Sequence, residues 1–162
     1  SGIIGPNAQR SGNVAPMISA FLKGSFRFLI TGGFDFVDVR DVAAGIVSAA
    51  DNGKAGECYI LSTRVISLVE LLNELAKCSG IPKPKIPLPL WVAKAVAPCA
   101  ELYSKLARKA PFFTLYSLQT ITGNSLYSNA KAVAELSYKT RSLEETDKDI
   151  VRTMTGNIRK KR

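Results

Sequence analysis

The chain of 162 residues contains no histidine and only three cysteines, Cys58, Cys78 and Cys99, spaced 20 and 21 residues apart. Without histidine and without a Cys-x-x-Cys pair, the sequence lacks the ligand spacing of a zinc knuckle. Three widely spaced cysteines also do not form the dense framework of a disulfide-rich secreted domain. The sequence therefore predicts no metal site, and we expect reduced thiols and a cytoplasmic location.

Long apolar runs are also missing. The most apolar region, residues 86–103, is interrupted by Lys94, Pro98 and Glu101, whereas a membrane span needs roughly 20 consecutive apolar residues. The first residues do not have the pattern of a signal peptide. We therefore expect no transmembrane helix.

Positive charge is in excess, with 22 Lys and Arg residues against 13 Asp and Glu residues and a net charge of +9. Four of these positive charges lie in the tail at residues 159–162, and acidic and basic residues alternate through most of the remaining chain. A nucleic-acid-binding surface gathers its basic residues on one face, interleaved with aromatic side chains. We therefore expect neither a nucleic acid nor a membrane as a partner.

The central stretch, residues 34–44, reads Phe-Asp-Phe-Val-Asp-Val-Arg-Asp-Val-Ala-Ala. Its first half alternates apolar and acidic residues, as in a half-buried strand, and its second half begins an apolar helix at about Arg40. The apolar run at residues 58–62 has the length of a buried parallel strand. Strand, helix and strand together predict an α/β fold with a right-handed crossover.

The remaining elements follow from local signals. Ser67 and Glu70 form a capping box for a helix that ends at Gly80, and Ser142 and Glu145 form a second one for a C-terminal helix reaching about residue 153. The four prolines in residues 81–89 predict an extended connector. Further predictions are helices at residues 13–23, 90–109 with a bend near Pro98, and 114–122, and a strand at 27–31.

Three separated segments carry a resemblance to a known family. They are the strand and Gly-Pro turn at residues 1–6, the central stretch, and residues 126–145 with their Lys-Ala and Leu-Ser-Tyr pattern. In this order they resemble the C-terminal half of extended or atypical short-chain dehydrogenase/reductases, the family of NAD-dependent epimerase/dehydratases and dihydroflavonol-reductase-like enzymes. The resemblance implies the last parallel strands of a Rossmann-like sheet plus a mostly helical substrate lobe.

The resemblance also implies a division of the chain and a set of partners. Residues 1–66 would end the sheet with interleaved lobe segments, residues 67–156 would form the substrate lobe and C-terminal helix, and residues 157–162 a basic tail. The cofactor loop and the catalytic Tyr-x-x-x-Lys would lie upstream, so NAD or NADP would bind only with the N-terminal Rossmann half. A chain without its first strands should expose an apolar sheet edge and tend to dimerise.

Site residues follow from the same resemblance. The first strand of this chain would pass beside the nicotinamide, and Arg40 would lie at a strand end where α/β ligand crevices form. Nucleotide-sugar epimerases commonly carry an arginine where this chain has Phe34, which favours a less charged substrate; Phe112, Phe113 and Tyr116 would add to an apolar site, or be core. We expect cofactor contacts from Ser1, Gly2 and Ile3, and substrate contacts from Pro6, Asn7, Arg10, Phe34, Arg40 and Trp91.

Three motifs have simpler explanations than catalysis. Residues 28–38 resemble a glycine-rich dinucleotide-binding loop in their sequence pattern, but Asp35 and Asp38 would repel the phosphates of a dinucleotide. Tyr127 and Lys131 have the Tyr-x-x-x-Lys spacing that lowers a phenol pKa on a helix, yet the helix is expected to begin after the tyrosine. Asp41 is expected to cap its helix, with Arg40 paired at the surface. We predict no catalytic residue in this chain.

Two functions remain open. The first is the substrate-binding portion of an NAD(P)-dependent oxidoreductase or epimerase that acts on a carbonyl or hydroxyl carbon of a small molecule and is inactive alone. The second is a free-standing, non-enzymatic α/β module. Its positive charge and the helix at residues 90–109 would bind an acidic partner or a membrane surface.

Overall fold

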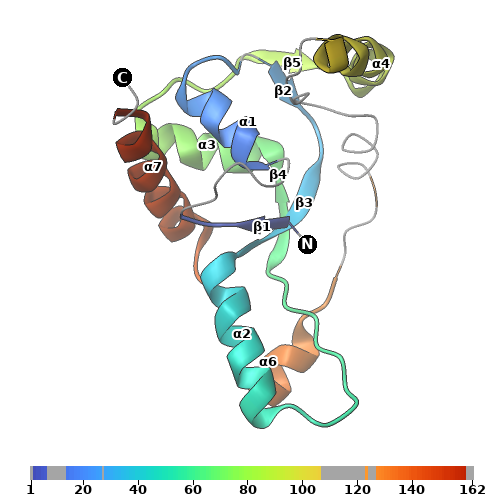
Figure 1. Cartoon of the computed structure of the whole chain (residues 1–162), viewed down its shortest axis with the longest axis vertical. Helices are drawn as coiled ribbons and strands as arrows, with labels where there is room; N and C mark the ends of the chain where they lie inside the picture. The colour runs from blue at the N-terminus through green and yellow to red at the C-terminus, as the bar shows by residue number, and fades with distance from the viewer. Residues whose placement is uncertain (1, 7–13, 27, 107–122, 124–126, 160–162) are drawn as a thin grey trace.

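The computed structural model describes residues 2–6, 14–26, 28–106, 123 and 127–159. They form an α/β structure with two small sheets, a main group of helices and a projecting arm (Figure 1). This confirms the expected fold class. The helix predicted at residues 114–122 lies outside the described residues.

The main sheet has three strands in the order β1-β3-β4. Strand β1 (Gly2–Ile4) runs parallel to β3 (Gly33–Asp38), with Ile4 opposite Asp38. Strand β4 (Arg64–Ser67) runs antiparallel to β3, with Phe34 opposite Ile66. Among the described residues β1 pairs with β3 alone, so β1 forms one edge of the sheet.

The predicted strand at residues 58–62 and its parallel crossover are wrong. Residues 57–63 do not form a strand, and the strand that pairs with β3 begins later, at Arg64. Helix α2 (Val39–Asn52) continues away from the sheet, and the chain returns beside β3 in the opposite direction, so β4 pairs antiparallel (Figure 1). Ile60 is 49% exposed, whereas Tyr59 and Leu61 are partly buried against Ala132, Leu136 and Tyr138.

A second sheet pairs β2 (Phe28–Ile30) with β5 (Ile86–Leu88) in parallel. The connector at residues 81–89 is extended, as its prolines predict, and β5 is a short strand within it. Helix α4 (Leu90–Leu106) follows and contains Pro98. None of the helices within the described residues is long and apolar enough to cross a membrane.

The main core lies where α1 (Val14–Leu22), α3 (Leu68–Ser79) and α7 (Leu143–Arg159) pack beside the sheets (Figure 1). Helix α3 packs its leucine face inward because Leu68, Leu71, Leu72 and Leu75 recur at helical spacing. The buried members of the core are Ile4, Met17, Ile18, Phe21, Phe36, Ile66, Leu68, Leu71, Leu72, Leu75, Ala93, Ala97 and Ile150.

Both predicted helix caps at the serines are confirmed. Ser67 Oγ accepts a hydrogen bond from the backbone N–H of Glu70 at 3.0 Å, and Ser142 Oγ accepts one from Glu145 at 3.2 Å. Gly80 closes α3 in the left-handed conformation, with φ of 71°. These caps satisfy backbone groups that a helix end leaves unpaired.

The arm consists of α2, α6 (Ala130–Leu136) and the coil at residues 53–63. Its own small core contains Ala132, Leu136 and Tyr138. Gly45 permits the close packing, because a Cβ added there would lie 2.7 Å from Leu61 Cδ2. The arm and α4 lie at opposite ends of the molecule (Figure 1).

Candidate functional site at the β3–α2 junction

The parallel strands β1 and β3 both end at the start of α2, which is where α/β folds form ligand crevices. Asp38 is the last residue of β3 and the N-cap of α2, because its Oδ1 accepts the backbone N–H of Arg40 at 2.8 Å. The expectation that Asp41 caps this helix is wrong. Asp41 lies within the first turn of the helix and is only 4% exposed.

Asp38 and Arg40 form the centre of the junction. Arg40 Nε donates to Asp38 Oδ1 at 2.9 Å and Nη2 to Oδ2 at 2.7 Å, and Thr146 Oγ1 adds a third side-chain hydrogen bond at 2.9 Å. Burial acts to raise the pKa of Asp38, but the hydrogen bonds from Arg40 and Thr146 outweigh it and leave the pKa below its ordinary value. The Asp38 carboxylate is therefore an ionised group that is fully paired within the protein.

Two further carboxylates close the network. Arg40 Nη1 donates to Asp149 Oδ2 at 2.6 Å, and Arg141 Nε donates to Asp41 Oδ1 at 2.8 Å. The hydrogen bond to Asp38 raises the pKa of Arg40. Three carboxylates thus face two guanidinium groups, so the junction has no excess positive charge to hold a diphosphate.

The predicted site residues within the described part of the chain lie on several elements rather than in one pocket. Gly2 and Ile3 lie on β1, where Ile3 is 55% exposed, and Pro6 is half-buried in the turn that follows. Phe34 is half-buried, with its ring 5.6 Å from that of Phe36. Ser1, Asn7 and Arg10 lie outside the described residues.

Two other predicted site residues differ in their surroundings. Arg40 is at the junction as expected, but its guanidinium is held by two aspartates, and it remains 34% exposed through its side chain. Trp91 is 74% exposed in the first turn of α4, at the end of the molecule opposite the arm (Figure 1). The structure therefore brings Gly2, Ile3, Pro6 and Arg40 toward one junction and leaves Trp91 apart.

The Tyr127 and Lys131 pair does not share a helix, because α6 begins at Ala130. Lys131 instead pairs with Glu57, and its Nζ lies 4.7 Å from the ring centroid of Tyr59. Lys131 therefore fixes the coil of the arm onto α6.

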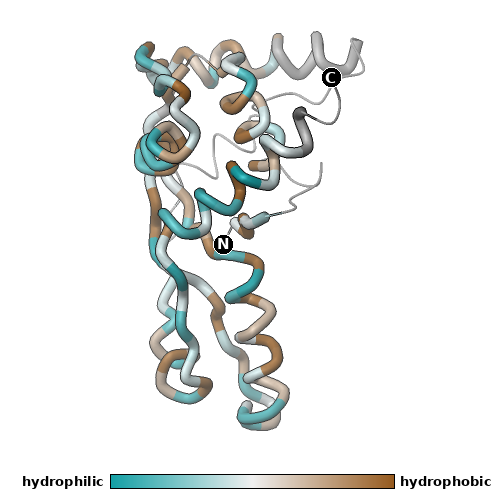
Figure 2. Tube along the Cα trace, turned by 90° about the vertical axis from the view of Figure 1, so that its left-hand side faces the viewer, coloured by the Kyte–Doolittle hydropathy of each residue, from teal (hydrophilic) through white to brown (hydrophobic). Residues whose placement is uncertain are grey.

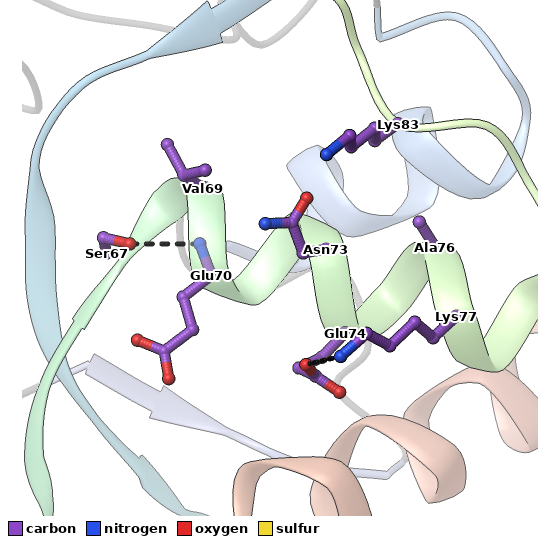
Figure 3. A pocket seen from close by; sticks show the side chains of 8 residues that line it. All are labelled: Ser67, Val69, Glu70, Asn73, Glu74, Ala76, Lys77 and Lys83. Carbon is purple, nitrogen blue, oxygen red and sulfur yellow. Dashed lines mark hydrogen bonds and ion pairs between the residues drawn. The ribbon is translucent and has the colours of Figure 1, made fainter.

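A groove of about 520 Å³ lies along α3 (Figure 3). Its charged groups are largely paired, since Lys77 bonds Glu74 at 2.6 Å and Glu70 pairs with Arg64. None of the sequence-predicted site residues lines it. The lining residues are Ser67, Val69, Glu70, Asn73, Glu74, Ala76, Lys77 and Lys83.

Sequence reasoning missed Arg141, Thr146 and Asp149 as parts of the junction. Each lies about 100 residues from its partner in the chain. The sequence separation is 100 residues for Arg141 and Asp41 and 108 residues for Thr146 and Asp38. A capping box marks the start of α7, but no local pattern indicates which strand end that helix meets. Within the parts of the chain that the structure describes, no three acidic or cysteine side chains are grouped to hold a metal ion.

Comparison with known proteins agrees with this architecture. The sequence matches no model of a known protein family. It is 30% identical over 152 residues to a dihydroflavonol 4-reductase-like protein of Synechocystis, covering 91% of this chain and 44% of that protein. It is 27% identical over 136 residues to sterol demethylase protein B of Methylococcus capsulatus, covering 83% and 42%.

Solved structures show the same fold. The crystal structure of gox2253 matches with a TM-score of 0.75 and 26% identity, over 97% of this chain and 48% of that one. A nucleoside-diphosphate-sugar epimerase from Pseudomonas aeruginosa matches with a TM-score of 0.71 and 21% identity, over 96% and 46%. UDP-glucuronic acid 4-epimerase from Bacillus cereus, solved with NAD, matches with a TM-score of 0.63 and 18% identity, over 96% and 43%.

The fold is therefore the C-terminal part of a Rossmann-like epimerase or reductase fold. The sequence of this chain is similar to that of a dihydroflavonol 4-reductase-like protein and to that of a sterol demethylase protein. It spans about half the length of the curated relatives that it matches.

Proposed function

We propose that this chain is the substrate-binding portion of an NAD(P)-dependent oxidoreductase or epimerase that acts on a carbonyl or hydroxyl carbon. An N-terminal Rossmann half supplies the cofactor loop and the catalytic Tyr-Lys pair. NAD or NADP binds only when both halves are present, and this chain alone has no turnover. Structures of the same fold carry NAD or NADPH, which supports this choice of cofactor.

The observation that carries the proposal is the position of β1. It is a parallel strand at the edge of the main sheet, and Ile3 on it is 55% exposed. Parallel strands are normally buried between neighbours and covered on both faces. An upstream strand paired with β1 would bring a cofactor to the carboxyl ends of β1 and β3, beside Gly2, Ile3 and Pro6.

The substrate is proposed to be a small molecule of low charge. Phe34 packs against the main core at the position where nucleotide-sugar epimerases commonly carry an arginine. The three carboxylates and two guanidinium groups of the junction also offer no excess cation to a diphosphate. The names of the two curated relatives, a dihydroflavonol reductase and a sterol demethylase protein, fit a neutral polycyclic alcohol or ketone.

Calorimetry with NAD and NADP tests the proposal, on this chain and on the same polypeptide extended upstream by its Rossmann half. The proposal is supported if the extended polypeptide binds a cofactor and this chain does not. It is contradicted if this chain binds a cofactor without the Rossmann half. It is also contradicted if neither polypeptide binds a cofactor. Turnover of a dihydroflavonol or a 3-hydroxysteroid, set against UDP-glucose, then tests the substrate class.

One observation favours the alternative of a non-enzymatic module on an acidic surface. Trp91 and Val96 on α4 are 74% and 54% exposed, and Lys83, Lys85 and Lys94 nearby in the chain are exposed as well. Aromatic and basic side chains together suit an anionic bilayer surface. Sedimentation with phosphatidylserine vesicles, lost on Trp91→Ala and absent with phosphatidylcholine vesicles, would support this alternative.

The three free cysteines fit a reducing compartment, and we propose the cytoplasm.

A further inference from the structure

Asp147 is an acidic residue in an apolar contact between two helices. It lies on α7, on the side that packs against α3, and it is 0% exposed. Hydrophilic residues are frequent along α7 in Figure 2, but Leu143, Ile150 and Met154 of the same helix pack in the main core. Neither carboxylate oxygen of Asp147 has a hydrogen-bond partner in the structure. An ionised carboxylate is costly in such surroundings, so burial favours the protonated form.

The cations near Asp147 are already paired. On α3 Lys77 pairs with Glu74, and on α7 Lys148 pairs with Glu144, each at 2.6 Å. Helix α1, which also contacts α7, contains no charged residue. Within the described parts of these three helices, no cation is therefore held against the Asp147 carboxylate.

The remaining titratable groups also favour the protonated form of Asp147. Burial raises its pKa to about 8, and the Glu74 carboxylate adds to the shift. The pKa of the half-buried Cys78 thiol is raised as well, first by burial and then by the Asp147 carboxylate. Cys78 is therefore neutral near pH 8 and offers no charge to Asp147. A carboxyl group that titrates near pH 8 is mostly neutral at about pH 7 and mostly ionised at about pH 9.

The residues on either side of Asp147 hold α7 against the β3–α2 junction. Thr146 Oγ1 donates to Asp38 Oδ2 at 2.9 Å, and Asp149 Oδ2 accepts from Arg40 Nη1 at 2.6 Å. The first turns of α7 therefore have two contacts, one with α3 through Asp147 and one with the junction through its neighbours. A movement of these turns away from α3 would disturb both contacts.

We propose that Asp147 is a pH-sensitive latch for the first turns of α7. These turns stay packed on α3 while the carboxyl group is protonated. When the group ionises, an arrangement in which its carboxylate reaches water becomes more favourable, and the turns leave α3 and the junction. Asp38 then loses its bond from Thr146, and Arg40 loses Asp149. The latch is additional to the function proposed above and depends only on residues of this chain.

The sign of the effect follows from the two protonation equilibria of Asp147. In the docked arrangement its pKa is about 8, whereas the pKa of an exposed aspartate is about 4. The docked arrangement therefore loses stability relative to the open one as the pH rises from about 4, and the loss levels off above about pH 8. Between about pH 6.5 and about pH 9 the ratio of open to docked molecules should rise by roughly thirtyfold.

Hydrogen exchange of single amides, followed by NMR on this chain, tests the latch. Protection compares each measured rate with the rate of the same amide in an unstructured chain at the same pH, so the base catalysis of exchange cancels. We expect the protection of the Thr146 and Arg141 amides to fall by about tenfold or more between about pH 6.5 and about pH 9. The Arg141 amide reports on the junction, because it donates to Asp41 Oδ2 at 2.9 Å.

Dilute urea separates the latch from unfolding of the whole chain. Opening of the first turns of α7 exposes little surface, so the protection of Thr146 and Arg141 should change little with urea, whereas that of Leu72 in α3 should fall steeply. If all three amides have the same protection and the same urea dependence, ionisation of Asp147 acts only on global unfolding and the proposal is overturned.

Substitution identifies the group responsible. Asp147→Asn is neutral at both pH values and should remove the fall in protection, whereas Glu145→Gln, on the exposed side of α7, should leave the fall unchanged. A fall that persists in Asp147→Asn, or one that is missing in the unaltered chain, overturns the proposal. Asp147→Leu provides a second neutral variant if circular dichroism shows that Asp147→Asn does not fold.

Discussion

Arg141 and Asp41, separated by 100 residues in the chain, make a two-point contact. The Arg141 side-chain Nε donates to Asp41 Oδ1 at 2.8 Å, and its backbone N–H donates to Oδ2 at 2.9 Å. The Asp41 side chain is 6% exposed and that of Arg141 is 24% exposed. Both oxygens of a buried carboxylate are thus satisfied by one residue, which joins α2 to the segment before α7.

Replacing Asp41 tests this contact. Asp41→Ala leaves the Arg141 guanidinium without this partner and removes the acceptor of a partly buried backbone N–H. We expect the free energy of unfolding to fall by about 2 kcal/mol, measured by urea denaturation. Asp51→Ala, an exposed position on the same helix, is the control and should change it by less than about 0.5 kcal/mol. Equal effects of the two substitutions would contradict the assigned role of the contact.

Asp147 makes stability depend on pH. It lies on α7 against α3, is 0% exposed, and neither of its carboxylate oxygens has a hydrogen-bond partner in the structure. Burial raises the pKa of Asp147 to about 8, and the neighbouring Glu74 carboxylate adds to the shift. The folded protein therefore holds a proton that the unfolded chain releases near pH 4.

Stability should consequently decrease as the pH rises from about 4 to about 8, because the unfolded state binds fewer protons over this range. The contribution of Asp147 is on the order of 1 kcal/mol per pH unit, and it levels off above pH 8. Asp147→Asn should flatten this part of the profile and raise the free energy of unfolding at pH 8. Glu145→Gln, on the exposed side of α7, is the matched control. A profile that is unchanged by Asp147→Asn would show that this group does not carry the dependence.

Two glycines should respond to alanine in opposite directions. Gly80 has φ of 71° at the end of α3, and Gly156 lies within α7; a Cβ at either position would meet no atom within 4 Å. Space is therefore not the issue at either site. Gly80→Ala should lower the free energy of unfolding by about 1 kcal/mol because of the left-handed backbone. Gly156→Ala should raise it by up to about 1 kcal/mol through helix propensity. Thermal unfolding of the two variants checks the sign, and a shared sign would contradict the conformational explanation.

Local signals predicted several elements correctly because each depends on neighbours within a few residues. Ser67 and Ser142 cap their helices, and Gly80 ends α3. The transition from strand to helix near Val39 is also where residues 34–44 indicate it. The predicted starts of α3 and α7 lie within one residue of the observed ones for the same reason.

Local signals failed where the outcome depended on distant partners. The apolar run at residues 58–62 resembles a strand, but it is coil within the arm and packs beside α6, where Tyr59 OH donates to Glu135 Oε2 at 2.7 Å. Asp41 has the usual sequence position of a cap, yet Asp38 takes that role and Asp41 binds Arg141. The local pattern cannot choose between Asp38 and Asp41, because the two residues have the same side chain, and it cannot show that residues 58–62 have no strand to pair with.

The sequence by itself determined the α/β class, the starts of α3 and α7, the end of α3 and the family resemblance, because periodicity, capping residues and motif spacing are local features of the chain. Only the tertiary structure decided that β4 runs antiparallel and that the charges at the β3–α2 junction neutralise each other. The physical reason is that these properties depend on residues far apart in the chain, 32 positions for Phe34 and Ile66 in the β3–β4 pair and 100 for Asp41 and Arg141. Burial, hydrogen bonding and ion pairing between such residues are set by the packed chain as a whole.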